Sequence, residues 1–235
     1  MAIHSEELPR EGNSIDAHFS QAARRLGLAS AATVVGLGAA YAITLAIGFA
    51  SLDSSSQAIG NPVFSILEIL ILSMMPAMVA LMTAVHAWAP VRVKACTLAS
   101  VVFMGAVAVV TSSVHFVILT VSRDSVFANE PWSPLLFSFE WPSVAYALDI
   151  LAWDIFFAIS MLFAAPAFGG TRLGIAIRTA LIVSAAFALA GLSGLPLGDM
   201  RIRNIGIIGY LGAFMVVASL LAILFYRAVP AKAPG

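Results

Sequence analysis

Charge is scarce in this sequence: only 10% of its 235 residues are Asp, Glu, Lys or Arg, whereas 61% are apolar. Soluble domains carry about 25% charged residues, so a single water-soluble core is excluded. The 12 basic and 12 acidic residues leave no net charge at pH 7. A nucleic-acid partner is therefore excluded as well, because phosphate contacts need a basic surface. We expect membrane lipids to surround most of the chain.

Several chemical signatures are also missing. The single cysteine, Cys96, excludes an internal disulfide and any metal site built from several cysteines. The chain has no P-loop, no dinucleotide-binding glycine fingerprint, no H-E-x-x-H zinc motif and no G-x-S-x-G nucleophile motif. We therefore predict no cofactor, and these motifs do not decide whether the protein is an enzyme.

Long apolar runs are what the sequence has in abundance. A helix that crosses about 30 Å of hydrocarbon needs about 20 mostly apolar residues. Six runs meet this requirement, at residues 26–50, 62–89, 95–121, 142–168, 173–195 and 204–226. Barrel strands would instead alternate in short runs. The sequence predicts an all-α integral membrane protein, a bundle of six transmembrane helices.

The basic residues indicate how the bundle is oriented. If the polar segment 1–25 and the tail 227–235 are cytoplasmic, nine Lys and Arg residues fall inside and three outside. This is the sense of the positive-inside bias. The first apolar run is long enough to span, so we interpret it as a retained anchor and not as a cleaved signal. We expect both termini in the cytoplasm and the protein in a bacterial inner membrane.

The longest predicted connection is the outer loop 122–141, which contains Pro131, Trp132, Pro134 and Trp141. Long loops with aromatic side chains are often functional, and indole rings prefer the headgroup level of a membrane. We expect this loop either to fold over the outer end of the bundle or to be anchored at the interface by its tryptophans.

Three acidic residues and one histidine interrupt the predicted spans: Glu68, His115, Asp149 and Asp154. Even on a lenient insertion scale, an ionised acid at the centre of a membrane helix costs about 2.5 to 3.5 kcal/mol. Such residues normally face the bundle interior, find partners there and mark function. They are the first candidates for a site.

Three of these residues are expected at one depth. The second and third helices are joined by a tight turn near residues 91 and 92, and Glu68 and His115 lie equally far before and after it. The same counting through the turn near residue 170 places Asp149 level with residues 192 and 193. At 1.5 Å per residue, each of the three lies roughly 9 to 10 Å below the outer end of its helix. We predict one polar layer.

Aromatic neighbours extend this layer. Tyr146 and Trp153 lie on the helix face of Asp149, three and four residues away, and Tyr210 on the sixth helix reaches a comparable depth. From these residues we predict a polar pocket that opens outward and binds a small ligand or a proton. A glutamate beside a histidine can relay protons, bind a cationic ligand or act as an acid/base pair.

Asp154 is expected deeper, about 16 to 18 Å from the outer end of its helix. It follows Asp149 by five residues, which is about 140° around an α-helix, so the two are not expected on one face. We expect Asp154 to be protonated or to bond to a hydroxyl such as that of Ser184. It is either a structural acid or the inner station of a proton path.

A stripe of soft side chains runs along the second helix, where Met74, Met78, Met82 and His86 follow one another at steps of four residues. Thioether ligands suit Cu(I), so this pattern is compatible with copper handling. Methionine is equally an ordinary filler of apolar cores. No other metal site is predicted.

Small residues recur on the sixth helix, where Gly206, Gly209 and Gly212 step by three. Such faces permit close helix contact inside a bundle or between protomers. The pattern is compatible with a homo-oligomer or with a partner in a membrane complex as well as with a single chain.

Three functions remain open from the sequence. The first is a membrane protein that binds a small ligand or a proton in an outward-opening polar pocket, as a transporter, a sensor or a ligand-binding subunit. The second is an intramembrane acid/base enzyme that acts on a lipid or isoprenoid, which needs a groove open to lipid and two titratable groups beside it. The third is a structural subunit of a larger membrane complex, in which each buried charge is satisfied by a bond between helices.

Overall fold

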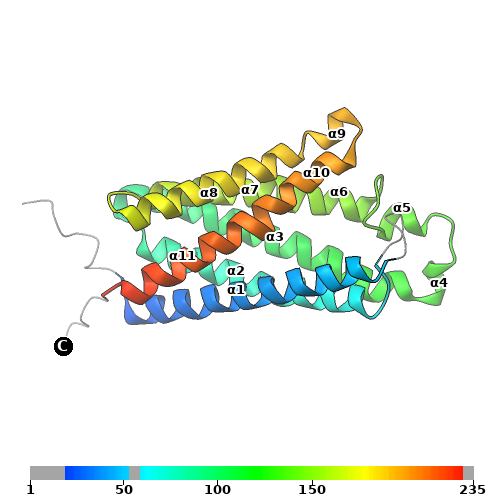
Figure 1. The fold of residues 1–235 in the computed structure, drawn as a ribbon, viewed down its shortest axis with the longest axis horizontal. Helices are drawn as coiled ribbons and strands as arrows, with labels where there is room; N and C mark the ends of the chain where they lie inside the picture. Colours follow the sequence, from blue (N-terminus) through cyan, green and yellow to red (C-terminus); the bar gives the residue numbers. More distant parts are fainter. Residues whose placement is uncertain (1–18, 53–58, 230–235) are drawn as a thin grey trace, which may run out of the picture.

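The computed structural model describes residues 19–52 and 59–229, and this part of the chain is helical without strands (Figure 1). Six helical runs are long and apolar enough to cross a membrane, in agreement with the sequence: Gln21–Ala50, Val63–Trp88, Val91–Thr120, Val144–Ala167, Arg172–Leu197 and Met200–Arg227. The architecture is compatible with a multi-pass membrane protein. The polar segment predicted at 1–25 and the tail at 227–235 lie largely outside the described residues.

The first half of the bundle consists of three long helices: α1 (Gln21–Ala50), α2 (Val63–Trp88) and, after the short turn η1 (Val91–Val93), α3 (Lys94–Thr120). The hydroxyl of Ser20 accepts a hydrogen bond from the third residue of the new helix and so caps the start of α1. Lys94 donates to two carbonyl groups at the end of α2 and so satisfies acceptors that the helix itself leaves free.

The outer loop is not extended, because it forms three short helical pieces: η2 (Val121–Arg123), α4 (Ser125–Ala128) and α5 (Ser133–Phe137). The rings of Phe127, Trp132 and Phe137 pack on one another, with centroids 6.1 to 6.5 Å apart. These pieces lie at the end of the bundle opposite the start of α1 (Figure 1).

The second half contains three further spans, and two of them change helix type midway. Their segments are α6 (Val144–Ile150), η3 (Leu151–Phe156), α7 (Phe157–Ala164), η4 (Ala165–Ala167), α8 (Arg172–Gly191), α9 (Gly194–Leu197), α10 (Met200–Ile207), η5 (Ile208–Ala213) and α11 (Phe214–Arg227). Both η3 and η5 are π-helical turns. The last span begins four residues before the predicted start at Asn204, because Asp199 caps it by accepting the Arg201 N–H.

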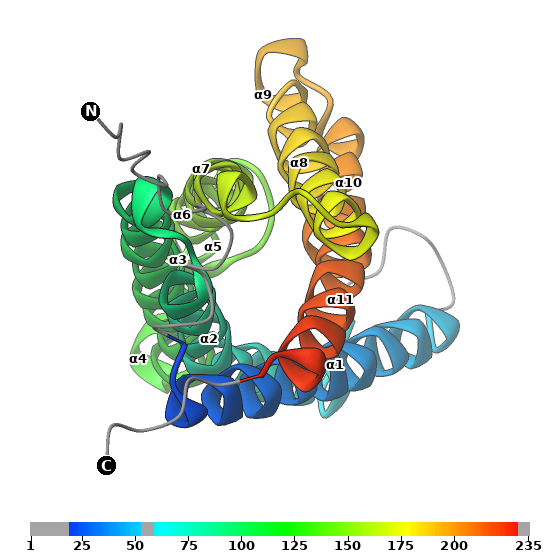
Figure 2. The ribbon, with the colours of Figure 1, turned by 90° about the vertical axis from the view of Figure 1, so that its left-hand side faces the viewer.

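The six spans form a closed ring (Figure 2). In this ring α1 packs on α2, α2 on α3, α3 on α7, α7 on α8, α8 on α11, and α11 returns to α1. The interior is filled by large apolar side chains without exposure, among them Met78, Phe157 and Phe214. The start of α1 and the end of α11 are joined directly, because the Arg24 guanidinium donates to the carbonyl groups of Phe225 and Tyr226.

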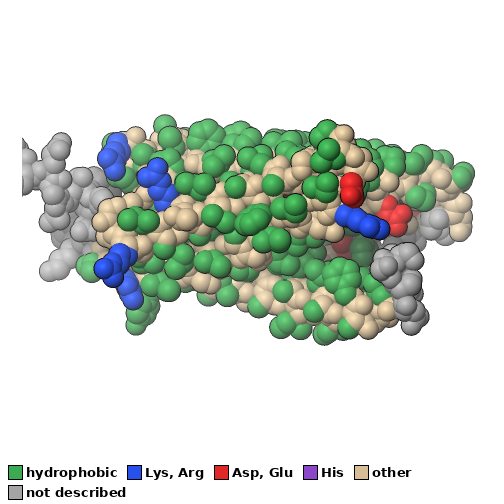
Figure 3. Space-filling model, turned by 45° about the horizontal axis from the view of Figure 1, so that its top comes forward, with side chains coloured by type: hydrophobic (Ala, Val, Ile, Leu, Met, Phe, Trp, Pro, Cys, Tyr) green, Lys and Arg blue, Asp and Glu red, His purple; other side chains and the backbone are tan. Residues whose placement is uncertain are grey.

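Charge is segregated between the two ends of the bundle. Figure 3 shows only basic side chains at the end where α1 starts and α11 finishes, and acidic side chains together with a basic one at the other end. In the described residues, the first end carries Arg24, Arg25, Arg92, Lys94, Arg172, Arg178 and Arg227. The acidic residues of the opposite half are Glu68, Asp124, Glu130, Glu140, Asp149, Asp154 and Asp199, and this half also contains Arg123, Arg201 and Arg203. We refer to these as the basic end and the acidic half.

Gly209, one of the three glycines that step along the last span, allows two helices to meet at backbone distance. A Cβ added at Gly209 would lie 2.6 Å from the carbonyl oxygen of Ser184 and 2.9 Å from the amide nitrogen of Ala188, both on α8. The Ser184 hydroxyl donates to the Gly209 carbonyl across the same contact, at 2.8 Å. At Gly212, by contrast, a Cβ would meet only the side chain of Ile208, at 3.8 Å.

Substituting these two glycines by alanine should therefore have effects of opposite sign. Gly209→Ala forces α8 and η5 apart and is expected to lower the free energy of unfolding by about 1 to 3 kcal/mol. Gly212→Ala causes no clash and only restricts the unfolded chain, so it is expected to raise the free energy of unfolding by up to about 1 kcal/mol. Unfolding in mixed detergent micelles measures both, and equal effects of the two substitutions would contradict this packing.

Candidate functional site

Five ionisable side chains form a continuous chain in the acidic half. The Glu68 carboxylate on α2 lies 2.8 Å from Nδ1 of His115 on α3, and Nε2 of this histidine lies 3.7 Å from an Asp149 oxygen on α6. The other Asp149 oxygen accepts from the Arg203 guanidinium on α10 at 2.8 Å. Arg203 also donates through Nε to Asp154 in η3, at 3.2 Å. We call these five residues the charged cluster.

The predicted polar layer thus brings Glu68, His115 and Asp149 together. Counting residues from the two tight turns places them at one depth, and the side chains also face one another. Part of the outer loop covers them, because the ring of Phe139 packs on the His115 imidazole with centroids 5.0 Å apart. The loop therefore shields one side of the charged cluster.

Arg203 is the residue that sequence reasoning missed. We placed it outside the sixth span, but its side chain is buried and pairs with two acids, while its guanidinium carbon lies 4.4 Å from the centre of the Tyr146 ring. The signal was present in the sequence. Residues 192 and 193 are level with Asp149. Residue 203 lies about as far after the turn at Gly198 as these two residues lie before it, so it is at the same depth.

The two aspartates share a face because their helix is not α-helical between them. The segment η3 has π-helical i→i+5 hydrogen bonding, which stacks residues five apart. This overturns the expected 140° separation of Asp149 and Asp154. The expected Ser184 partner is also wrong, since that hydroxyl donates to the Gly209 carbonyl and Asp154 pairs with Arg203.

The other two predicted aromatic residues, Trp153 and Tyr210, lie next to the cluster. Trp153 is buried, and its ring packs on that of Tyr210 with centroids 5.1 Å apart. Neither side chain hydrogen-bonds to a member of the cluster in the described part of the chain. Tyr146 contacts the cluster through the Arg203 guanidinium, and the Tyr210 phenol interacts electrostatically with the same group.

The charged cluster is almost completely removed from solvent. The exposed fractions are 0% for Asp154, 3% for Glu68, 5% for His115, 7% for Arg203 and 9% for Asp149. Three acids face one arginine and one histidine, so the formal charge is −1 when His115 is protonated and −2 when it is neutral. Two polar atoms in the cluster, His115 Nε2 and Asp154 Oδ1, are buried without a hydrogen bond.

These residues divide into an exchangeable part and a fixed part. The guanidinium of Arg203 does not release its proton in proteins, so it is a permanent counter-charge. Glu68, His115 and Asp149 can each gain or lose a proton, and they are neighbours in space. Arg203 separates these three groups from Asp154 in the chain of contacts.

The methionine stripe lies away from this cluster. Met74, Met78 and Met82 are buried in the apolar core, and Nδ1 of His86 hydrogen-bonds to the Thr97 hydroxyl at 2.9 Å. No group of three or more His, Cys, Asp or Glu in residues 19–52 and 59–229 is placed to hold a metal ion. The packing of these side chains is that of core fillers.

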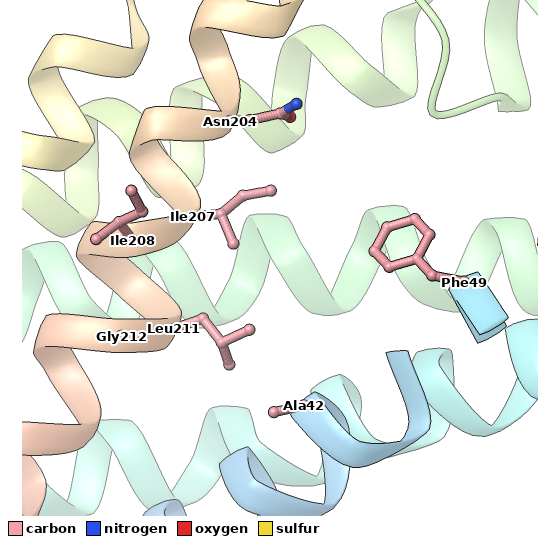
Figure 4. Close-up of a pocket in the computed structure, with 7 residues that line it drawn as sticks. All are labelled: Ala42, Phe49, Asn204, Ile207, Ile208, Leu211 and Gly212. Atoms are coloured by element: carbon pink, nitrogen blue, oxygen red, sulfur yellow. The ribbon is translucent and has the colours of Figure 1, made fainter. Parts of the chain in front are cut away.

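A separate groove opens in the acidic half, between α1 and the last span, α10 and η5 (Figure 4). It has a volume of about 570 Å³, and Ala42 and Phe49 from α1 face Asn204, Ile207 and Leu211 of the last span across it. Its lining is almost entirely apolar. None of the five charged residues lines it.

Comparison with known proteins gives no relative: the chain matches no family model, no curated protein and no solved structure.

Proposed function

We propose that this chain is a multi-pass membrane protein that binds a proton in the charged cluster, as part of a transporter, a sensor or a ligand-binding subunit. The observation that carries the proposal is the imbalance of three acids against two basic groups in a nearly closed site. An uncompensated charge in such surroundings is costly, whereas a bound proton removes it. The exchangeable group Glu68–His115–Asp149 is where the proton would be held.

The orientation of the proposed site follows from the charge segregation. Basic residues are concentrated at one end of the bundle, and positive residues favour the cytoplasmic side of bacterial membranes. We place the basic end, with the start of α1 and the end of α11, in the cytoplasm. The charged cluster then lies in the outer half of the membrane, where a proton can reach it from the outside.

A structural role is the second candidate, because the same pairs join α2, α3, α6 and α10. Two observations favour proton binding over it. A purely structural set needs no surplus acid, and bonds between membrane helices contribute only about 0.6 kcal/mol on average. In addition, Nε2 of His115 is buried without a hydrogen bond, which a structural role does not require.

Counting protons tests the proposal. Purified protein in weakly buffered detergent solution is titrated from alkaline to neutral pH, beside the isosteric variant Asp149→Asn. Wild type is expected to take up about one more proton per chain, because only it retains the surplus negative charge. Glu130→Gln, an exposed acid of the outer loop, is the matched control and should match wild type over this range. Identical curves for wild type and Asp149→Asn would refute proton binding by the cluster.

A further inference from the structure

The groove between α1 and α10 has the chemistry of a site for an aliphatic chain. Phe49, Ile207, Ile208 and Leu211 supply apolar walls, and Gly212 leaves its floor open. The lining residues of the last span lie four to twelve positions after its start at Met200, or roughly 6 to 18 Å below the outer end. At this depth the groove faces the acyl region of a membrane.

The groove exists because two helices that touch near the basic end separate toward the acidic half. Gly27 and Gly38 of α1 lie against Phe225 and Met215 of α11, so closely that an added Cβ would clash with either side chain. Beyond Gly38 the helices diverge, and Figure 4 shows Ala42 facing the last span across open space. The opening is therefore fixed by packing below it.

Both walls of the groove adjoin the charged cluster. Asn204, which lines it, directly follows Arg203. On the other wall, Ala42 follows Tyr41, whose phenol interacts electrostatically with Asp149 and Glu68. Asp149 is also the most exposed member of the cluster. The groove and the cluster are thus connected through neighbouring residues of both helices.

We propose that the groove binds the aliphatic tail of a long-chain amine, with the cationic head at Asp149. The sign of the head follows from the surplus negative charge of the cluster, on which the proposed function also rests. An anionic head would be repelled, and a neutral head would leave the surplus uncompensated. Because a proton and a cationic head satisfy the same charge, binding of the amine releases the proton from the cluster.

Equilibrium binding tests this inference in nanodiscs of zwitterionic lipid. The probes are a long-chain alkylamine, the alcohol of equal length and the alkyl sulfate of equal length. Wild type is expected to bind the amine about tenfold more tightly than the alcohol, and the sulfate most weakly. Gly212→Leu and Ile207→Trp fill the groove and should each weaken amine binding by about tenfold. Val102→Trp, at an exposed apolar position of α3, is the matched control and should bind like wild type.

Two results would overturn the inference: equal affinity for amine and alcohol in wild type, or wild-type affinity in both filled variants. Proton counting on the same preparations separates it from the proposed function. If the cluster takes up its proton but the amine does not bind, only the groove assignment fails. If neither occurs, both proposals fail. Release of a proton on amine binding, lost in Asp149→Asn, is the expected link between the two sites.

Discussion

Replacing Arg203 by Leu is expected to lower the free energy of unfolding by about 3 to 5 kcal/mol, the largest effect of any single substitution in this bundle. The guanidinium is the shared partner of Asp149 and Asp154, at 2.8 and 3.2 Å, and all three side chains are buried. Its loss leaves Asp154 without a counter-charge and leaves Asp149 with only His115, at 3.7 Å. Unfolding in mixed detergent micelles at neutral pH measures the effect.

Two further variants separate charge from packing. In the triple variant Arg203→Leu/Asp149→Asn/Asp154→Asn no unpaired charge remains, and at least half of the lost stability should return. Arg201→Ala removes an exposed arginine from the same helix turn and should change the free energy of unfolding by no more than about 0.5 kcal/mol. A triple variant as unstable as Arg203→Leu would show that the ion pairs are not what the bundle loses.

His115→Leu is expected to cost about 3 kcal/mol, because it leaves Glu68 buried without the imidazole that lies 2.8 Å away. The double variant His115→Leu/Glu68→Leu removes the stranded carboxylate and should be more stable than His115→Leu alone. The double-mutant cycle therefore yields a coupling energy of at least about 1 kcal/mol. Thermal unfolding of the four proteins in one detergent provides the measurement.

His86 offers a matched control for this cycle. It lies near the basic end of α2, and its imidazole makes one hydrogen bond, to Thr97, without an ion pair to any acid among the described residues. His86→Leu should cost about 1 kcal/mol, the usual contribution of one hydrogen bond. Additive effects at His115 and Glu68 would mean that the two side chains do not act as a pair.

The six spans and part of the site could be predicted from the sequence. Apolar runs identify membrane-spanning helices because their length has to match the hydrocarbon thickness. Tight turns fix the relative depth of neighbouring helices, which is why Glu68, His115 and Asp149 could be placed in one layer. Whether these side chains face one another depends on helix rotation, which the sequence pattern leaves open.

The missing parts of the site have specific physical causes. Asp149 and Asp154 share a face only because η3 is π-helical, and no residue pattern in this segment indicates a change from 3.6 residues per turn. Arg203 was assigned to a loop because hydropathy ended the span at Asn204, whereas the Asp199 cap starts the helix at Met200. The groove depends on where α1 and the last span diverge, which is a property of their packing.

The central claim is that three acids and two basic groups in one buried cluster hold an exchangeable proton. Infrared spectroscopy tests it most directly, because a protonated carboxyl group has its own carbonyl absorption that shifts in D₂O. Wild type at neutral pH is expected to show this band. Either Glu68→Gln or Asp149→Asn should abolish it, while Asp154→Asn and Glu130→Gln leave it unchanged. Absence of the band in wild type, or its persistence in both Glu68→Gln and Asp149→Asn, would contradict the claim.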